Sequence, residues 1–158
     1  MAAPTETLEF WPDRPQALVE RMGEMAVTGD GWINLTPHVG DEDPELPGDG
    51  LFGAFSARGP AVPLCTWVPA RRRRERRGRQ SLGVQHATGT RAAARLAGAG
   101  HPVPEGWRVT QDHPRRGLVV EVHADEPPER VLSWLIGAGE ALCLPTPTGQ
   151  WRAALYRG

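Results

Sequence analysis

The chain of 158 residues has the size of one ordinary domain, and folding should bury roughly two thirds of the surface that its unfolded form exposes. Hydrophobic residues make up 39% and charged residues 23%, so we expect one folded domain over residues 1–158 rather than a disordered chain. The formal net charge of -1 gives no overall attraction to nucleic acid or to membranes. Any anionic partner must therefore be argued from local charge.

Composition also bears on location and redox state. All 18 basic residues are arginine, a skew typical of a GC-rich genome. Residues 1–9 lack the pattern of a secretory signal, and no run approaches the ~20 apolar residues that span a bilayer, so we expect a cytoplasmic protein without membrane contact. Cys65 and Cys143 belong to no C-x-x-C pair, and we expect reduced thiols. The sequence predicts no metal and no cofactor, and no pattern indicates an oligomeric state.

The first part, residues 1–70, predicts a helix and two to three short strands. Pro15 suits an early helical position, and Leu18, Met22 and Met25 recur at helical spacing, which predicts a helix over residues 15–27. Short apolar runs predict strands over residues 32–35, 51–55 and 64–68. Residues 37–50 are acidic and broken by Pro and Gly, so we expect a solvated loop rather than a cation site. Its candidate ligands are His38, Asp41, Asp43 and Glu45.

Residues 71–80 differ sharply in composition from the rest of the chain. Seven arginines stand there against a single acidic residue, Glu75. Blocks of like charge repel themselves and are normally solvated. We expect a linker loop between two parts of the chain.

The second part, residues 81–158, predicts the order strand, helix, strand, strand, helix, strand. The expected strands cover residues 81–86, 107–111, 118–123 and 151–157, and the expected helices begin near residues 88 and 127. This βαββαβ order is that of ferredoxin-like folds, in which an antiparallel sheet has both helices on one face. The expected class is therefore α+β, with the first part extending the sheet or covering its open face.

The arginine-rich stretch is the leading functional candidate. Guanidinium groups displace the counterions condensed on phosphate backbones, which gives salt-sensitive, sequence-independent attachment. We therefore predict a binding module for nucleic acid or an acidic protein surface. The residues involved are Arg71, Arg72, Arg73, Arg74, Arg76, Arg77 and Arg79. The alternative is a bare surface loop produced by coding bias.

The scarcity of aromatic residues at positions expected to face outward favours the alternative of a bare surface loop. Among the sheet positions expected to face outward only Tyr156 is aromatic, so sequence-specific reading of RNA is not predicted. We expect five of the six tryptophans to pack in the core. Trp11 alone, between Phe10 and Pro12, is expected to mark an exposed contact, which leaves open an accessory subunit with a hydrophobic patch.

A second candidate site combines a helix start with a turn. Backbone amides near Thr90 and Arg91 would favour an anion, and residues 112–117 place a carboxylate, an imidazole and two guanidiniums in one turn. The alternative function is thus a small enzyme or binding protein for a phosphorylated or carboxylated small molecule. Its catalytic candidates are His86, Asp112 and His113, and its anion-binding candidates include Arg115 and Arg116. Helix capping and an ordinary hairpin turn explain the same residues without a ligand.

Overall fold

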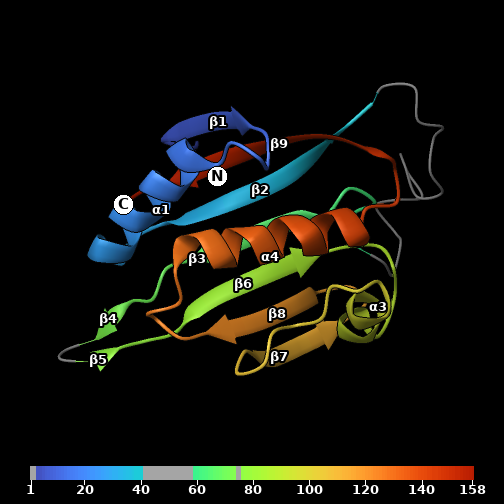
Figure 1. Cartoon of the computed structure of the whole chain (residues 1–158). Coiled ribbons are helices and arrows are strands. Elements are labelled where there is room, and N and C mark those ends of the chain that lie inside the picture. Colours follow the sequence, from blue (N-terminus) through green and yellow to red (C-terminus); the bar gives the residue numbers. More distant parts are fainter. Residues whose placement is uncertain (1–2, 41–58, 74–75) are drawn as a thin grey trace.

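The computed structural model describes residues 3–40, 59–73 and 76–158, and gives only the backbone of residues 72–73 and 76–77. Within these ranges three helices lie on one face of a seven-stranded antiparallel sheet (Figure 1). The α+β class and the antiparallel sheet predicted from the sequence are confirmed.

The described residues of the first part of the chain form three strands of this sheet and one helix that packs on it. These are β1 (Glu6–Phe10), α1 (Gln16–Thr28), β2 (Trp32–Val39) and β3 (Leu64–Val68). The buried stripe of α1 consists of Leu18, Met22 and Met25, and the helix ends at Gly29, whose φ of 72° is the left-handed conformation that glycine tolerates. The helix and the strand over residues 64–68 confirm the predictions. The strand predicted over residues 51–55 lies outside the described residues.

The second part follows the predicted succession of elements. These are β6 (Gln80–Gln85), α3 (Ala92–Gly98), β7 (Arg108–His113), β8 (Gly117–Val122), α4 (Pro128–Ala141) and β9 (Pro147–Tyr156). α3 is shorter than expected and begins only after Arg91, which has a φ of 59°. The residues from Thr88 to Thr90 are therefore a connection and not the first turn of a helix.

The ferredoxin-like strand order is not confirmed. That order would place β9 beside β6, whereas the observed order is β1-β9-β2-β3-β6-β8-β7. β2 and β3 are inserted between the two strands, and β9 pairs with both β1 and β2. The insertion is favourable because Ile33 and Leu35 of β2 pair with Leu155 and Ala153 of β9, all of them buried.

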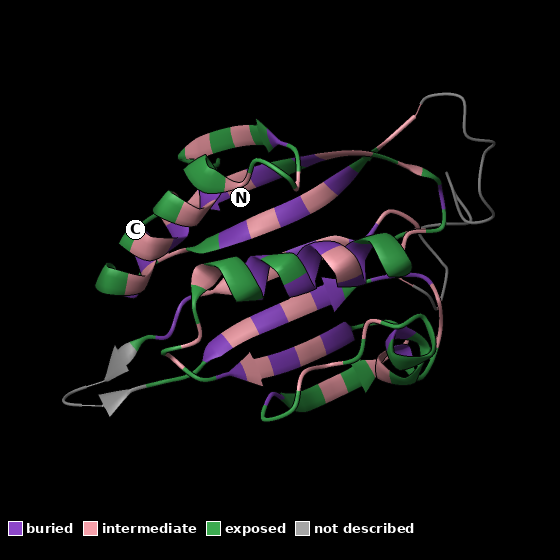
Figure 2. Ribbon diagram, viewed as in Figure 1, coloured by how far each residue is buried: buried purple, intermediate pink, exposed green. Residues whose placement is uncertain are grey.

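The core lies between the sheet and the helices. Buried and partly exposed residues alternate along β2, β3 and β6, as the purple and pink bands in Figure 2 show. Leu82, Val120, Leu135 and Trp151 belong to one continuous buried cluster on the helical side. The opposite face of the sheet is covered by no described helix, which is why its residues keep partial exposure.

The arginine-rich stretch contains two short strands where a linker loop was predicted. β4 (Arg72–Arg73) and β5 (Arg76–Arg77) form a separate antiparallel ribbon. On either side of it β3 and β6 pair directly, with Val68 opposite Ser81. The stretch therefore continues a hairpin within one sheet and does not join two separate halves.

Candidate functional site

Residues 71–79 are called the arginine arm, and its two described strands, β4 and β5, project beyond the end of the sheet (Figure 1). Its register places Arg72 opposite Arg77 and Arg73 opposite Arg76. At its base the amide of Gly78 donates a hydrogen bond of 2.8 Å to the carbonyl oxygen of Arg71. Arg74 lies outside the described residues. The backbone thus presents the arginine run as a ribbon with a defined base.

The root of the arm is fastened to the core by Gln80, which is only 5% exposed. Its Oε1 accepts a hydrogen bond of 2.8 Å from Nε1 of Trp67. Its Nε2 donates to the carbonyl oxygens of His123 and Glu126, at 2.9 and 3.0 Å. One side chain therefore ties β3, β6 and the connection after β8 together where the arm leaves the fold. The role of Gln80 was not predicted from the sequence, where a glutamine that begins an apolar strand was the available signal.

The two arginines at the base of the arm, Arg71 and Arg79, differ in their ion pairing from several arginines on the body of the molecule. Arg71 and Arg79 are exposed, and neither forms an ion pair with a described residue. Arginines elsewhere often do, as in the pairs Arg21–Glu6, Arg108–Glu121, Arg130–Glu126, Arg152–Glu9 and Arg157–Glu24. Several guanidinium groups on the body are thus paired with carboxylates, whereas Arg71 and Arg79, the two arginines of the arm with described side chains, are not.

The second candidate site lies at the opposite end of the sheet. The turn after β7 and the start of α3 are neighbours there, as the small-molecule hypothesis required. However, the carboxylate of Asp112 accepts hydrogen bonds of 3.0 Å from the amides of both Ala92 and Ala93. Asp112 therefore occupies the position that a bound anion would take, and acts as the cap of α3.

His86 is fully buried between these elements. Its Nδ1 accepts hydrogen bonds from the amide and the hydroxyl of Thr88, at 3.2 and 2.8 Å, so in the neutral ring Nε2 carries the proton. Nε2 has no hydrogen-bond partner among the described residues. Burial lowers the pKa of His86, which the Asp112 carboxylate partly offsets and Arg95 reinforces. The imidazole is thus held neutral and away from solvent.

Of the remaining candidates of this site, His113 stabilises the turn between β7 and β8. Nδ1 of His113 accepts hydrogen bonds of 3.1 Å from the amides of Arg115 and Arg116. The side chains of Arg115, Arg116, Thr90 and Arg91 are exposed. The structure therefore brings His86, Asp112 and the start of α3 together, but it places all of them at the far end of the sheet from the arginine arm.

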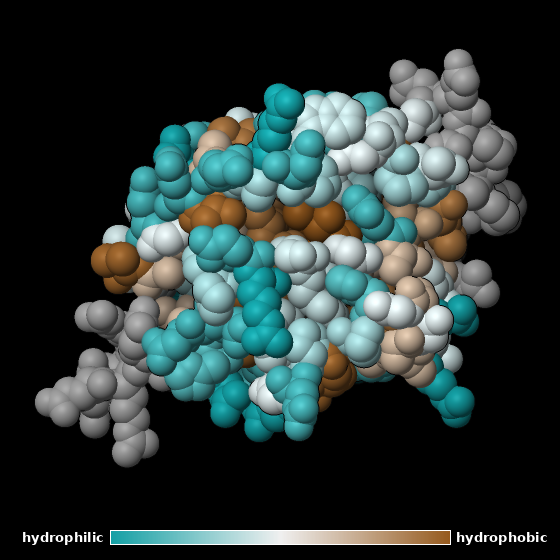
Figure 3. Space-filling view, in the orientation of Figure 1, coloured by the Kyte–Doolittle hydropathy of each residue, from teal (hydrophilic) through white to brown (hydrophobic). Residues whose placement is uncertain are grey.

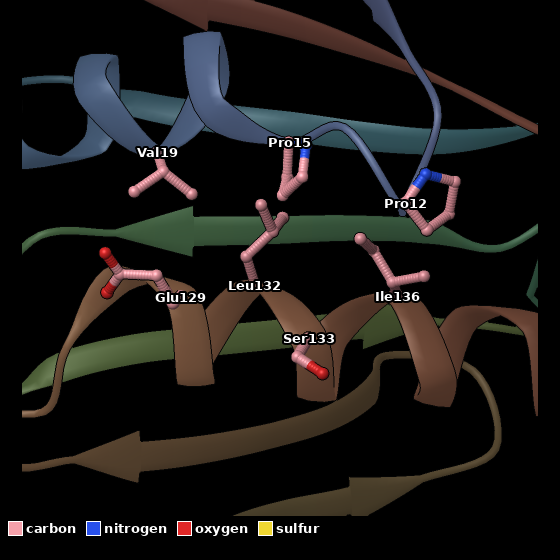
Figure 4. Close-up of a pocket in the computed structure, with 7 residues that line it drawn as sticks. All are labelled: Pro12, Pro15, Val19, Glu129, Leu132, Ser133 and Ile136. Atoms are coloured by element: carbon pink, nitrogen blue, oxygen red, sulfur yellow. The ribbon is translucent and has the colours of Figure 1, made fainter.

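A shallow apolar groove runs between α1 and α4 on the helical side. Hydrophobic residues gather along it in Figure 3. It encloses about 110 Å³. In Figure 4, Leu132 and Ile136 of α4 point toward the α1 side; the complete lining is Pro12, Pro15, Val19, Glu129, Leu132, Ser133 and Ile136. No predicted site residue lies in it. Trp11, nearby in sequence, is 48% exposed, as expected.

The described part of the chain contains no group of three or more potential metal ligands. In the same part no helix has the length and apolarity needed to cross a membrane. Neither Cys65 nor Cys143 forms a disulfide, and burial raises the pKa of the Cys65 thiol to about 12, so that thiol remains protonated.

Comparison of the chain with protein-family models, with curated proteins and with solved structures finds no match. Geometry and charge are thus the grounds on which its function is inferred.

Proposed function

We propose that this chain is a non-enzymatic nucleic-acid-binding module that docks the phosphate backbone on the arginine arm. The proposal rests on the strand register of the arginine arm. The register of β4 and β5 sets arginine opposite arginine twice, on a ribbon outside the fold. Like charges on directly opposite residues repel, and a polyanion lying along the ribbon relieves that repulsion while releasing its own condensed counterions.

The expected attachment is independent of base sequence, because every nucleotide offers the same phosphate. Guanidinium groups suit this contact, since their planar donors bind phosphate oxygens in pairs. The buried root at Gln80 supports the same use, because it holds the base of the arm in one place. A cytoplasmic location, expected from the sequence, would give the arm access to nucleic acid.

The test is binding of a labelled oligonucleotide, followed by anisotropy between about 50 and about 200 mM salt. Seven phosphate contacts predict a slope of log affinity against log salt that approaches about −6, and a loss of affinity of several thousand-fold over this range. Neutralising the arm should bring the slope close to zero. The variant carries glutamine at Arg71, Arg72, Arg73, Arg74, Arg76, Arg77 and Arg79.

Two matched variants make the result specific. Lysine at the same seven positions keeps the charge and should keep most of the slope. The pair Arg115→Gln and Arg116→Gln removes exposed charge at the far end of the sheet and should leave binding unchanged. Equal affinity of the wild-type chain and the glutamine variant would refute the proposal. Polyglutamate competing as well as the oligonucleotide would assign the arm to an acidic protein surface instead.

A further inference from the structure

The face of the sheet that no described helix covers carries an aromatic pair at the same end as the arm. Trp32 of β2 lies directly opposite Tyr156 of β9. Their rings are stacked, with centroids 4.8 Å apart and planes inclined by 8°. Both residues alternate with buried neighbours, Ile33 and Leu155, and therefore point to the uncovered face.

Trp32 departs from the behaviour of most tryptophans in this chain. It keeps 37% of its surface exposed, whereas Trp67, Trp107, Trp134 and Trp151 are all buried. It was expected in the core. A large indole at the surface, already aligned with a second ring, offers apolar area in a fixed orientation.

Strand register places this pair beside the root of the arm. Ile33 pairs with Trp67, so Trp32 is the neighbour of Val68, the last residue of β3. Arg71 follows only three residues later, a path of about 10 Å in extended chain. The first guanidinium of the arm is therefore within reach of a nucleotide that contacts the aromatic pair.

The next row of this face is built from short side chains. Ala154, Asn34, Thr66 and Gly83 lie opposite one another across β9, β2, β3 and β6. Asn34 and Thr66 use their polar groups on each other, through a hydrogen bond of 2.9 Å. Nothing in this row rises to the height of the two rings, so bases lying on the face would meet Trp32 and Tyr156 first.

We infer that the partner is single-stranded nucleic acid, and that an unpaired base stacks on the Trp32–Tyr156 pair while Arg71, at the base of the arginine arm, holds the adjoining phosphate. This inference rests on the proposed function and adds the class of nucleic acid. Base–aromatic stacking is available to any base whose face is free. In a duplex the faces are covered by neighbouring base pairs, so only single strands gain this contact.

The test compares a single strand and a duplex of equal length, with the wild-type chain and with Trp32→Leu. We expect the substitution to weaken single-strand binding about 5- to 100-fold and to leave duplex binding unchanged. Trp11→Leu is the matched control, because Trp11 is also exposed but lies after the end of β1 that is far from the Trp32–Tyr156 pair. It should change neither affinity.

Trp32→Phe supplies a second readout in a chain that keeps a ring and its fold. The single strand should quench the tryptophan emission of the wild-type chain, and the phenylalanine variant should bind with similar affinity but lose much of this quenching. Single-strand affinity unchanged in Trp32→Leu, with quenching unchanged in Trp32→Phe, would overturn this inference and leave the arm intact. If binding is lost when the arm is neutralised but not in Trp32→Leu, the proposed function of the arm is supported and the stacking inference fails. This result separates the two proposals.

Discussion

His86 lies in an environment that disfavours protonation of its imidazole ring. Its ring is fully buried, its Nδ1 is occupied by Thr88, and burial is the main cause of its lowered pKa. A proton binds more readily to this histidine in the unfolded chain than in the folded one. Its contribution to the free energy of unfolding is therefore complete above the unfolded pKa of about 6.5 and is lost as the pH falls below it, toward the folded value.

The expected result is a chain that becomes less stable on acidification below about pH 6.5, with His86 contributing at most about 1.4 kcal/mol per pH unit. His86→Asn keeps an acceptor for Thr88 and removes the titration, so this part of the slope should vanish even if the variant is less stable overall. Urea unfolding at several pH values measures it. His123→Asn, at an exposed histidine, should retain the slope; equal slopes in His86→Asn and the wild-type chain would contradict the assignment.

The exposure of Trp32 was not predicted from the sequence. Composition and size favour the core for any tryptophan. The alternation Trp32-Ile33-Asn34-Leu35 held the contrary signal, because a strand that buries Ile33 and Leu35 must turn Trp32 outward. The second ring was not predictable, since the pairing of Trp32 with Tyr156 joins the two distant strands β2 and β9.

The root of the arm is held by the hydrogen bonds of one side-chain amide, that of Gln80. Gln80→Met preserves the shape of the side chain but leaves Nε1 of Trp67 and the carbonyl oxygens of His123 and Glu126 without this partner. Buried groups left unsatisfied are costly, and we expect a loss of about 2 to 3 kcal/mol in the free energy of unfolding. Urea denaturation measures the change.

Ser81→Ala is the matched control for that substitution, because Ser81 is the next residue of β6 and points to the uncovered face. It should alter stability by less than about 0.5 kcal/mol. A Gln80→Met chain as stable as the wild type would show that water replaces the amide at these groups.

Elements with a strong local pattern were predictable, and elements defined by their neighbours were not. α1 and α4 bury stripes at helical spacing, and β3 is a compact apolar run, so each is visible in sequence alone. β1 was missed because only Leu8 and Phe10 mark it and it is an edge strand. The linker reading of the arm followed charge alone, whereas the pairing of β3 with β6 makes the intervening chain reverse.

The strand order of the sheet joins the two parts of the chain in one folded unit. β9 lies between β1 and β2, and β3 pairs with β6. A specific protease site inserted between Arg74 and Glu75 should therefore yield, after cleavage, two fragments that elute together and unfold in one cooperative transition. Size-exclusion chromatography and thermal unfolding by circular dichroism test this.

The uncut chain with the same insertion is the reference for that experiment. Separation of the fragments on the column, or two unfolding transitions that match isolated halves, would show that the parts fold independently. The functional residues predicted from the sequence lie at two ends of the sheet. The arginine arm leaves one end, and His86 and Asp112 lie at the other.

The position of β9 in the sheet determines when the sheet can be completed during synthesis of the chain. Of the seven strands of the sheet, β1 and β2 are synthesised before the others, yet β9, which must lie between them, is synthesised last. Until it emerges, the nascent chain carries two unsatisfied strand edges that are open to wrong partners. We therefore expect native structure to form only after synthesis of β9, and slowly, as is usual where pairing joins segments distant along the chain.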